Sequence, residues 1–203
     1  MLLAAALAAS LAAPAQAQVR ANYSHANGPF TRAYGKTLPP IGYVEFCARH
    51  KADCRPLGGK TRKLRLTPAR WDLLMQVNSF VNGKIRPVTD QKLFGRPEVW
   101  EYPTNAGDCE DYVLLKKRYL EGLGFPAETL LITVVLDEAG AGHAVLLART
   151  GSGDFVLDNR RDRIMLWYKT GYRFLKRQSQ YNPNRWVSLT RSGKHGARFF
   201  GKN

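Results

Sequence analysis

The sequence is short of cysteine and of acidic residues, and it has no long apolar run beyond its first residues. Three Cys and 16 Asp+Glu stand against 31 Lys+Arg in 203 residues, which gives a formal net charge of +15 and a pI near 10.0. After residue 17 no segment approaches the roughly 18 apolar residues that a membrane span needs. Its 18 Gly and 11 Pro follow no period, which excludes collagen. No block repeats at about 20 to 50 residues, which excludes solenoids and propellers. With 44% hydrophobic residues the chain can bury a core, and we expect one globular domain over residues 18–190.

The first 17 residues have the composition of an export signal. They carry no charged side chain, consist almost entirely of Leu and Ala, and end in the triplet Ala-Gln-Ala at positions 15–17. Pro14 before that triplet suits a cleavage site better than it suits the alternative, a buried N-terminal helix. The sequence therefore predicts a secretory signal peptide over residues 1–17 and a mature protein that begins near Gln18, in the periplasm or secreted.

The cysteines acquire meaning in an oxidising compartment, where paired thiols persist. Cys47 and Cys54 are close enough in sequence to form a disulfide across a short loop, which leaves Cys109 as the free thiol. A metal site formed by Cys47, His50 and Cys54 is the competing interpretation, but it offers only three ligands at irregular spacing.

Helices are expected in the middle of the chain. Residues 18–65 are rich in Gly, Pro and aromatic side chains and are expected to be extended or irregular. A Thr-Pro pair predicts a helix over residues 67–83, whose apolar stripe is typical of a core face. A second helix is expected over residues 109–122, with Asp108 as its N-cap.

Strands are expected after these helices, because the apolar runs become short and β-branched and Gly-containing turns separate them. The predicted strands cover residues 129–136, 143–149, 155–158, 164–168 and 186–189. Helices followed by an antiparallel sheet form an α+β plan.

Three residues in this plan suggest chemistry. Cys109 is placed at a helix N-terminus, where the helix dipole and unpaired N–H groups favour a thiolate and could stabilise an oxyanion. A turn near Gly151 would bring His143 within two or three residues of Asp158 on the neighbouring strand. Nucleophile, base and orienting carboxylate would then form a Cys-His-Asp triad.

Each of these residues also has a structural interpretation: a small core thiol, a hydrogen-bonded strand His and a turn-forming Asp. The acids around Cys109 make a core thiol unfavourable. Asp108 and Glu110 are explained either by helix capping or by a site for a hard cation, and without a cation such close carboxylates would raise the thiol pKa.

The motif blocks resemble the bacterial transglutaminase-like cysteine proteinase family, a branch of the papain-like superfold. The matching blocks, within about residues 40–190, are VNSFVNGKI, WEYP, GDCEDYVLLKKRYLEGLGFP, HAVLLART and GDFVLDN. The resemblance implies that Cys109 is the nucleophile, His143 the general base and Asp158 the orienting acid. It also implies a Ca²⁺ site at Asp108 and Glu110, no other cofactor, and a periplasmic enzyme whose protein substrate is a surface adhesin, so that cleavage controls biofilm release.

The positive charge is concentrated near the C-terminus. From Arg160 to the end, twelve Lys and Arg stand against Asp162 alone, which gives +11 of the total. This excess is interpreted either as a solvated face with a basic tail over residues 191–203, or as attraction to an acidic substrate, an anionic envelope surface or cell-wall polymer. Nucleic acid fits an exported protein poorly, and no reading motif is present.

The leading functional hypothesis is therefore a periplasmic cysteine endopeptidase that forms a thioester acyl-enzyme. A second hypothesis keeps the triad but transfers the acyl group to an amine or hydrolyses a cell-wall amide. A third is a non-catalytic basic module that binds the envelope.

Overall fold

The computed structural model describes residues 28–58 and 62–191 as four α-helices and nine strands, with two short 3-10 turns. The helices are α1 (Ile41–Arg49), α2 (Pro68–Lys84), α3 (Asp90–Phe94) and α4 (Cys109–Gly122), and the 3-10 turns are η1 (Ala127–Thr129) and η2 (Trp167–Lys169). The strands are β1 (Lys36–Thr37), β2 (Arg86–Pro87), β3 (Ala106–Gly107), β4 (Leu130–Leu136), β5 (Gly142–Thr150), β6 (Gly153–Asp158), β7 (Arg161–Leu166), β8 (Arg173–Gln178) and β9 (Trp186–Ser188).

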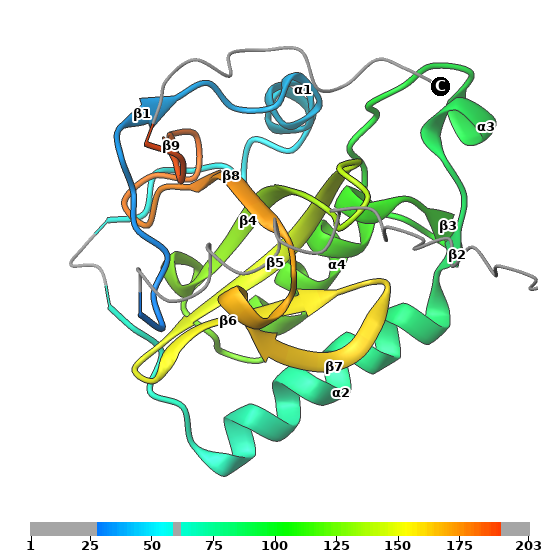
Figure 1. The fold of residues 1–203 in the computed structure, drawn as a ribbon. Coiled ribbons are helices and arrows are strands. Elements are labelled where there is room, and N and C mark those ends of the chain that lie inside the picture. Colours follow the sequence, from blue (N-terminus) through cyan, green and yellow to red (C-terminus); the bar gives the residue numbers. More distant parts are fainter. Residues whose placement is uncertain (1–27, 59–61, 192–203) are drawn as a thin grey trace, which may run out of the picture.

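Seven of these strands form one sheet in the order β1-β9-β8-β4-β5-β6-β7, and all of its neighbouring pairs are antiparallel. The predicted mixed architecture with an antiparallel sheet is confirmed. Strands β2 and β3 form a separate parallel pair beside the start of α4. Figure 1 shows α2 along one side of the sheet and α1 close to β1 and β9.

Helices α2 and α4 begin where the sequence predicts. The Thr67 hydroxyl accepts a hydrogen bond from Arg70 N at 3.3 Å, and Pro68 occupies the first turn of α2, where its missing N–H costs nothing. Helix α4 packs on β5 and on α2, and buries Leu114 and Leu120 in the larger of two apolar clusters. The apolar clusters lie on the two faces of the sheet, since successive residues of β5 alternate between them.

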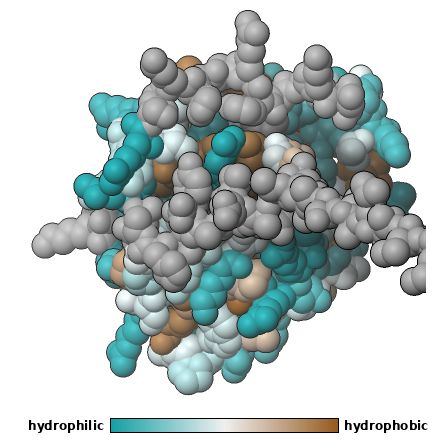
Figure 2. All heavy atoms as spheres, viewed as in Figure 1, coloured by the Kyte–Doolittle hydropathy of each residue, from teal (hydrophilic) through white to brown (hydrophobic). Residues whose placement is uncertain are grey.

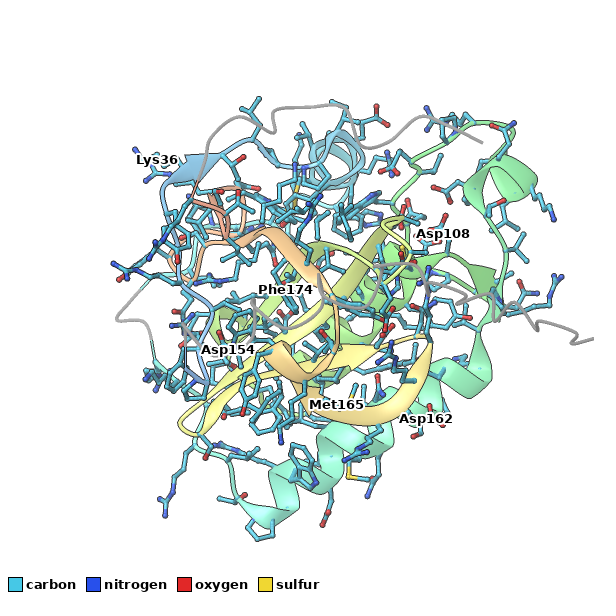
Figure 3. All side chains as sticks on the ribbon, in the orientation of Figure 1. Lys36, Asp108, Asp154, Asp162, Met165 and Phe174 are labelled. Carbon is cyan, nitrogen blue, oxygen red and sulfur yellow. A yellow bond between two sulfur atoms is a disulfide. The ribbon has the colours of Figure 1, made fainter. Side chains whose placement is uncertain are left out.

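The face of the sheet that holds the smaller apolar cluster also holds the described residues before β1. Thr31 donates from both N and Oγ1 to Asp154 Oδ2 at 2.7 Å, and the guanidinium of buried Arg177 donates to Thr31 Oγ1. Asp154 is fully buried at the start of β6. These contacts hold residues that are far apart in sequence against the sheet. In Figure 3, Asp154 and Asp108 lie at opposite ends of the sheet.

The predicted disulfide is present. Cys47 in α1 and Cys54 just after it are bonded, with an S–S distance of 2.07 Å, and Cys109 is the remaining free cysteine. His50 is therefore not part of a Cys-His metal site. Its Nε2 instead contacts Glu101 Oε1 at 2.5 Å, and Arg49 donates to the same carboxylate.

Two regions differ from the sequence prediction. Residues predicted to be irregular contain α1, which Pro40 precedes as N-cap, because Tyr43 and Phe46 pack into the core and Tyr43 meets Trp100 edge to face. Strand β8 was not predicted, since its sequence RFLKRQ is mostly polar; its buried Arg177 and Gln178 are stabilised by hydrogen bonds.

The bounds of one predicted strand also change. The segment expected as a strand over residues 164–168 begins earlier, as β7, and its last two residues form η2. The signal peptide and most of the basic tail lie outside the described residues. Within the described part of the chain, no helix is long and apolar enough to cross a membrane.

Candidate active site

The free thiol lies where helix, strand and loop meet. Cys109 is the first residue of α4, with Asp108 as its N-cap, and is partly exposed. Its Sγ accepts a hydrogen bond at 3.3 Å from Ala144 N, which directly follows His143 in β5. The thiol therefore lies against the backbone of β5 at the end where the predicted base is found.

His143 and Asp158 form a buried pair. His143 Nε2 lies 2.9 Å from Asp158 Oδ1, and both side chains are almost fully inaccessible to solvent. An ionised carboxylate only accepts hydrogen bonds, so Nε2 carries the proton and Nδ1 has the free lone pair. Nδ1 is buried and has no hydrogen-bond partner among the described residues. In this tautomer Nδ1 can accept a proton.

The Asp158 carboxylate is held from several sides. Oδ1 also accepts from Arg160 N at 3.0 Å, and Oδ2 accepts from the Tyr172 hydroxyl at 2.6 Å. Burial would raise the pKa of Asp158, but the hydrogen bond and charge of His143, together with the other two donors, lower it to about 2. Asp158 is therefore ionised at any physiological pH.

The pairing of β5 with β6 explains how residues 15 positions apart meet. Leu146 faces Leu157 in an antiparallel register that continues to the Gly151 turn, so Asp158 comes within two or three residues of the position opposite His143. This is the register predicted from the turn. A shift in the β6–β7 register at the end of β6 then adjusts the direction of Asp158.

The thiol itself does not point as the sequence suggested. Cys109 Sγ donates to Glu110 Oε2 at 3.1 Å, and no hydrogen bond joins the described side chains of Cys109 and His143. Burial, followed by the charges of Glu110 and Asp108, raises the pKa of Cys109 well above its usual value. Of the two opposing effects expected from the sequence, the rise caused by the adjacent carboxylates, reinforced by burial, therefore outweighs the helix dipole in this arrangement.

Three carboxylates converge beside the thiol. One oxygen each from Asp90, Asp108 and Glu110 lie within 4.8 Å of one another. Burial raises the pKa of all three, and the charge of Asp108 adds to the rise for Asp90 and Glu110. Asp90 Oδ1 and Asp108 Oδ1 are buried without a hydrogen-bond partner among the described groups. Hard oxygen donors with unused lone pairs suit Ca²⁺, so these residues fit the cation that the sequence predicted at Asp108 and Glu110.

Asp90, which lies 18 residues before Asp108, is a member of this cluster that the sequence did not predict. The parallel β2–β3 pair brings it there: Arg86 N donates to Asn105 O at 2.9 Å and Val88 N donates to Gly107 O at 3.0 Å. Asp90 N in turn donates to Asp108 Oδ2 at 3.3 Å. Two-residue strands leave no apolar pattern, so no local signal indicated this contact.

The segment before α4 is also fixed by an acid. Asp111 Oδ1 accepts from Glu101 N at 2.9 Å, and Asp111 Oδ2 accepts from Asp108 N at 3.3 Å. Tyr102 N donates to the Glu101 carboxylate. These contacts occupy the N–H groups of residues 101 and 102, so neither N–H can stabilise an oxyanion formed beside Cys109. A Cβ at Gly107 would lie 2.5 Å from Asp111 Oδ2, which restricts this position to glycine.

Part of the C-terminal positive charge is already paired. Arg160 forms an ion pair with Asp137 at 2.6 Å and Arg161 with Glu138, which joins the β6–β7 turn to the β4–β5 turn at the rim of the site. Figure 2 shows hydrophilic side chains over much of the visible described surface, with hydrophobic ones in small separate areas. These contacts give no support to the hypothesis that the basic residues bind an anionic envelope surface.

Known proteins share this arrangement of elements. The model of the family described as bacterial transglutaminase-like cysteine proteinase BTLCP matches residues 33–194, whereas no curated protein matches the chain. Among solved structures, EGTA-treated Legionella pneumophila LapG is 24% identical, with 76% of this chain and 89% of that chain covered and a TM-score of 0.52. Calcium-bound Legionella pneumophila LapG is 22% identical, with 79% and 94% covered and a TM-score of 0.52. At these identities the likeness shows a shared fold alone.

Proposed function

Because the chain belongs to the bacterial transglutaminase-like cysteine proteinase family and is a cysteine peptidase of that type, we propose that it is an exported endopeptidase whose catalytic residues are Cys109, His143 and Asp158. The observation that carries the assignment is the buried hydrogen bond between His143 Nε2 and Asp158 Oδ1. It leaves Nδ1 as the basic atom of His143. His143 directly precedes Ala144, whose N–H donates to the free Cys109 thiol.

In the proposed reaction, Cys109 first transfers its proton to His143 Nδ1. Rotation of the thiol away from Glu110 is required, since Sγ now donates to that carboxylate. Sγ then attacks the carbonyl carbon of the substrate, and the N–H of Cys109 at the helix N-terminus stabilises the oxyanion. The C–N bond breaks as His143 gives its proton to the leaving amine, which leaves a thioester.

Hydrolysis of the thioester uses the same base. His143 Nδ1 takes a proton from water while the water oxygen attacks the thioester carbonyl, and the C–S bond then breaks to release the acid and the thiol. Asp158, ionised and hydrogen-bonded to Nε2, stabilises the imidazolium that forms in each step.

We further propose that Asp90, Asp108 and Glu110 hold a Ca²⁺ ion. The buried, unpartnered oxygens of Asp90 and Asp108 support this assignment, as do the EGTA-treated and calcium-bound forms of LapG. A bound Ca²⁺ would neutralise negative charge beside Cys109 and so lower its pKa. Titration calorimetry should show Ca²⁺ binding that Asp90→Asn weakens at least about tenfold, whereas Asp53→Asn, an exposed acid outside the cluster, should have no effect. Equal affinity in both variants would refute the site.

The substrate is proposed to be a protein, and the family resemblance supports a surface adhesin. Mass spectrometry of new N-termini in the envelope fractions of cells with the wild-type chain or Cys109→Ala would identify it. A cleavage product that depends on Cys109 supports the peptidase assignment.

Turnover of p-nitrophenyl acetate tests the chemistry without a peptide, because this activated ester acylates a nucleophilic thiol directly. A burst of one nitrophenol per chain followed by turnover is expected, and Cys109→Ala should abolish both. Burst and turnover that survive Cys109→Ala would refute the assignment of the nucleophile, whereas a wild-type protein that shows neither would favour a non-catalytic binding module.

A further inference from the structure

A tyrosine lies behind the orienting carboxylate. The Tyr172 hydroxyl donates to Asp158 Oδ2 at 2.6 Å, on the opposite carboxylate oxygen from the one that faces His143. The rings of Tyr172 and His143 meet edge to face, with centroids 5.6 Å apart and an interplanar angle of 83°. Tyr172 is 8% exposed. It therefore contacts both members of the pair while standing outside the reacting atoms.

The surroundings of Tyr172 restrict its position. Its N–H donates to Thr170 Oγ1 at 3.2 Å, and the guanidinium of Arg161 lies 5.1 Å from the centre of its ring. Arg161 is itself paired with Glu138. The chain reaches Tyr172 through Gly171 at φ +81°, a conformation that L side chains rarely adopt. The turn at Gly171, the guanidinium of Arg161 and the contact with Thr170 thus direct the hydroxyl toward Asp158.

Because it stays protonated, Tyr172 can act only as a donor to the carboxylate. Burial, followed by the hydrogen bond and charge of Asp158, raises the pKa of Tyr172. Without its hydroxyl, Asp158 Oδ2 would be buried with no other hydrogen-bond donor among the described residues. The carboxylate could then rotate, and Oδ1 would no longer be held in one position for the hydrogen bond with His143 Nε2.

We propose that Tyr172 is a positioning residue, which locks the Asp158 carboxylate by its hydroxyl and thereby holds His143 in the Nε2–H tautomer with Nδ1 free. This inference rests on the proposed function of His143 as base. It adds a positioning residue to the three proposed catalytic residues. The motif blocks of the sequence end before Tyr172, so only the fold brings it to the site.

The tautomer can be measured without catalysis. Ring ¹⁵N resonances of His143 should be recorded in Cys109→Ala and in Cys109→Ala/Tyr172→Phe, since they separate protonated from unprotonated ring nitrogens. The parent protein should show protonated Nε2 and unprotonated Nδ1, and Tyr172→Phe should shift both resonances toward their average. Tyr168→Phe, which removes a hydroxyl with no hydrogen bond to a described residue, is the matched control and should shift neither.

The kinetic test asks whether Tyr172 acts through Asp158. For p-nitrophenyl acetate, Tyr172→Phe should lower kcat about tenfold, the typical effect of one hydrogen bond to a charged group, with KM changed less than about twofold. In an Asp158→Asn background, the same substitution should change kcat less than about twofold, because the carboxylate that it positions is gone.

Two results would overturn the proposal. One is unchanged His143 resonances in Tyr172→Phe, and the other is an equal loss of kcat in both backgrounds. If Tyr172→Phe lost its native circular dichroism, 3-fluorotyrosine at position 172 would replace it, since this keeps the ring but strengthens the donor. Its failure to move the His143 resonances would equally refute the proposal. The resonance measurement uses inactive protein, so it stands apart from the ester turnover that tests the proposed function.

Discussion

Lys116 should destabilise the fold at neutral pH. It lies in α4, its side chain is fully buried, and its Nζ has no hydrogen-bond partner among the described residues. Burial lowers its pKa from 10.5 to about 7, although the charges of Asp158 and Asp162 oppose this shift. Lys116→Met keeps much of the volume and removes the charge, so it should stabilise the protein.

The sign follows from proton binding. Between about pH 7 and 10.5 the unfolded chain keeps the Lys116 proton and the folded chain does not, so the stability of the wild type rises with pH. One pKa unit corresponds to about 1.4 kcal/mol. At pH 7 the folded protein therefore loses about 4 kcal/mol through Lys116, and at pH 9.5 only about 1 kcal/mol.

Urea unfolding at both pH values measures this difference. Lys116→Met should raise the free energy of unfolding by about 4 kcal/mol at pH 7 and by about 1 kcal/mol at pH 9.5. The neighbouring Lys117 is the control with the opposite sign, since its Nζ donates to two carbonyl oxygens, of Ala127 and Leu130, and pairs with Glu121. Lys117→Met should cost about 1–2 kcal/mol at either pH. A Lys116→Met variant that gains nothing at pH 7, or gains equally at both pH values, would refute the reasoning.

Three further outcomes are expected. Reducing the Cys47–Cys54 disulfide should lower the free energy of unfolding by about 2 kcal/mol, as urea curves with and without reductant would show; identical midpoints would contradict it. Asp154→Ala should cost about 3 kcal/mol in calorimetry, because it removes both contacts to Thr31 and leaves the half-buried Arg149 without its carboxylate partner; a loss below about 1 kcal/mol would speak against that network. Ionised Asp158 contributes about 2 kcal/mol to stability, which is complete above about pH 4 and is lost as the pH falls to about 2. Asp158→Asn should therefore reduce the fall in the free energy of unfolding between these two pH values. An equal fall in the wild type and the variant would contradict this contribution.

Much of the site could be predicted because its signals are local. A helix start, two strands and one Gly turn determine where Cys109, His143 and Asp158 come, and each is encoded within a few neighbouring residues. The short Cys47–Cys54 spacing is local in the same way. The catalytic roles of the three residues stay a proposal.

What the sequence missed depends on contacts between distant segments. Asp90 reaches Asp108 through a two-residue parallel pair, and Tyr172 reaches Asp158 from the position just before β8, a strand that was not predicted because its sequence is mostly polar. Helix α1 forms in a segment rich in Gly and Pro because Tyr43 gains burial against Trp100. The acids that raise the thiol pKa are visible in the sequence, but the burial that makes their effect exceed that of the helix dipole is not.

The edge of the sheet has a consequence for folding. Strand β9 closes the edge of β8, and β1 closes the edge of β9, so the first and last described strands complete the sheet together. Such closure spans nearly the whole chain and carries a high loop-closure entropy, which makes it a slow step. A chain that emerges from its N-terminus onward must wait for residues 186–188 before β1 can pair. During that interval β8 presents an open edge, which is a template for pairing with a second chain.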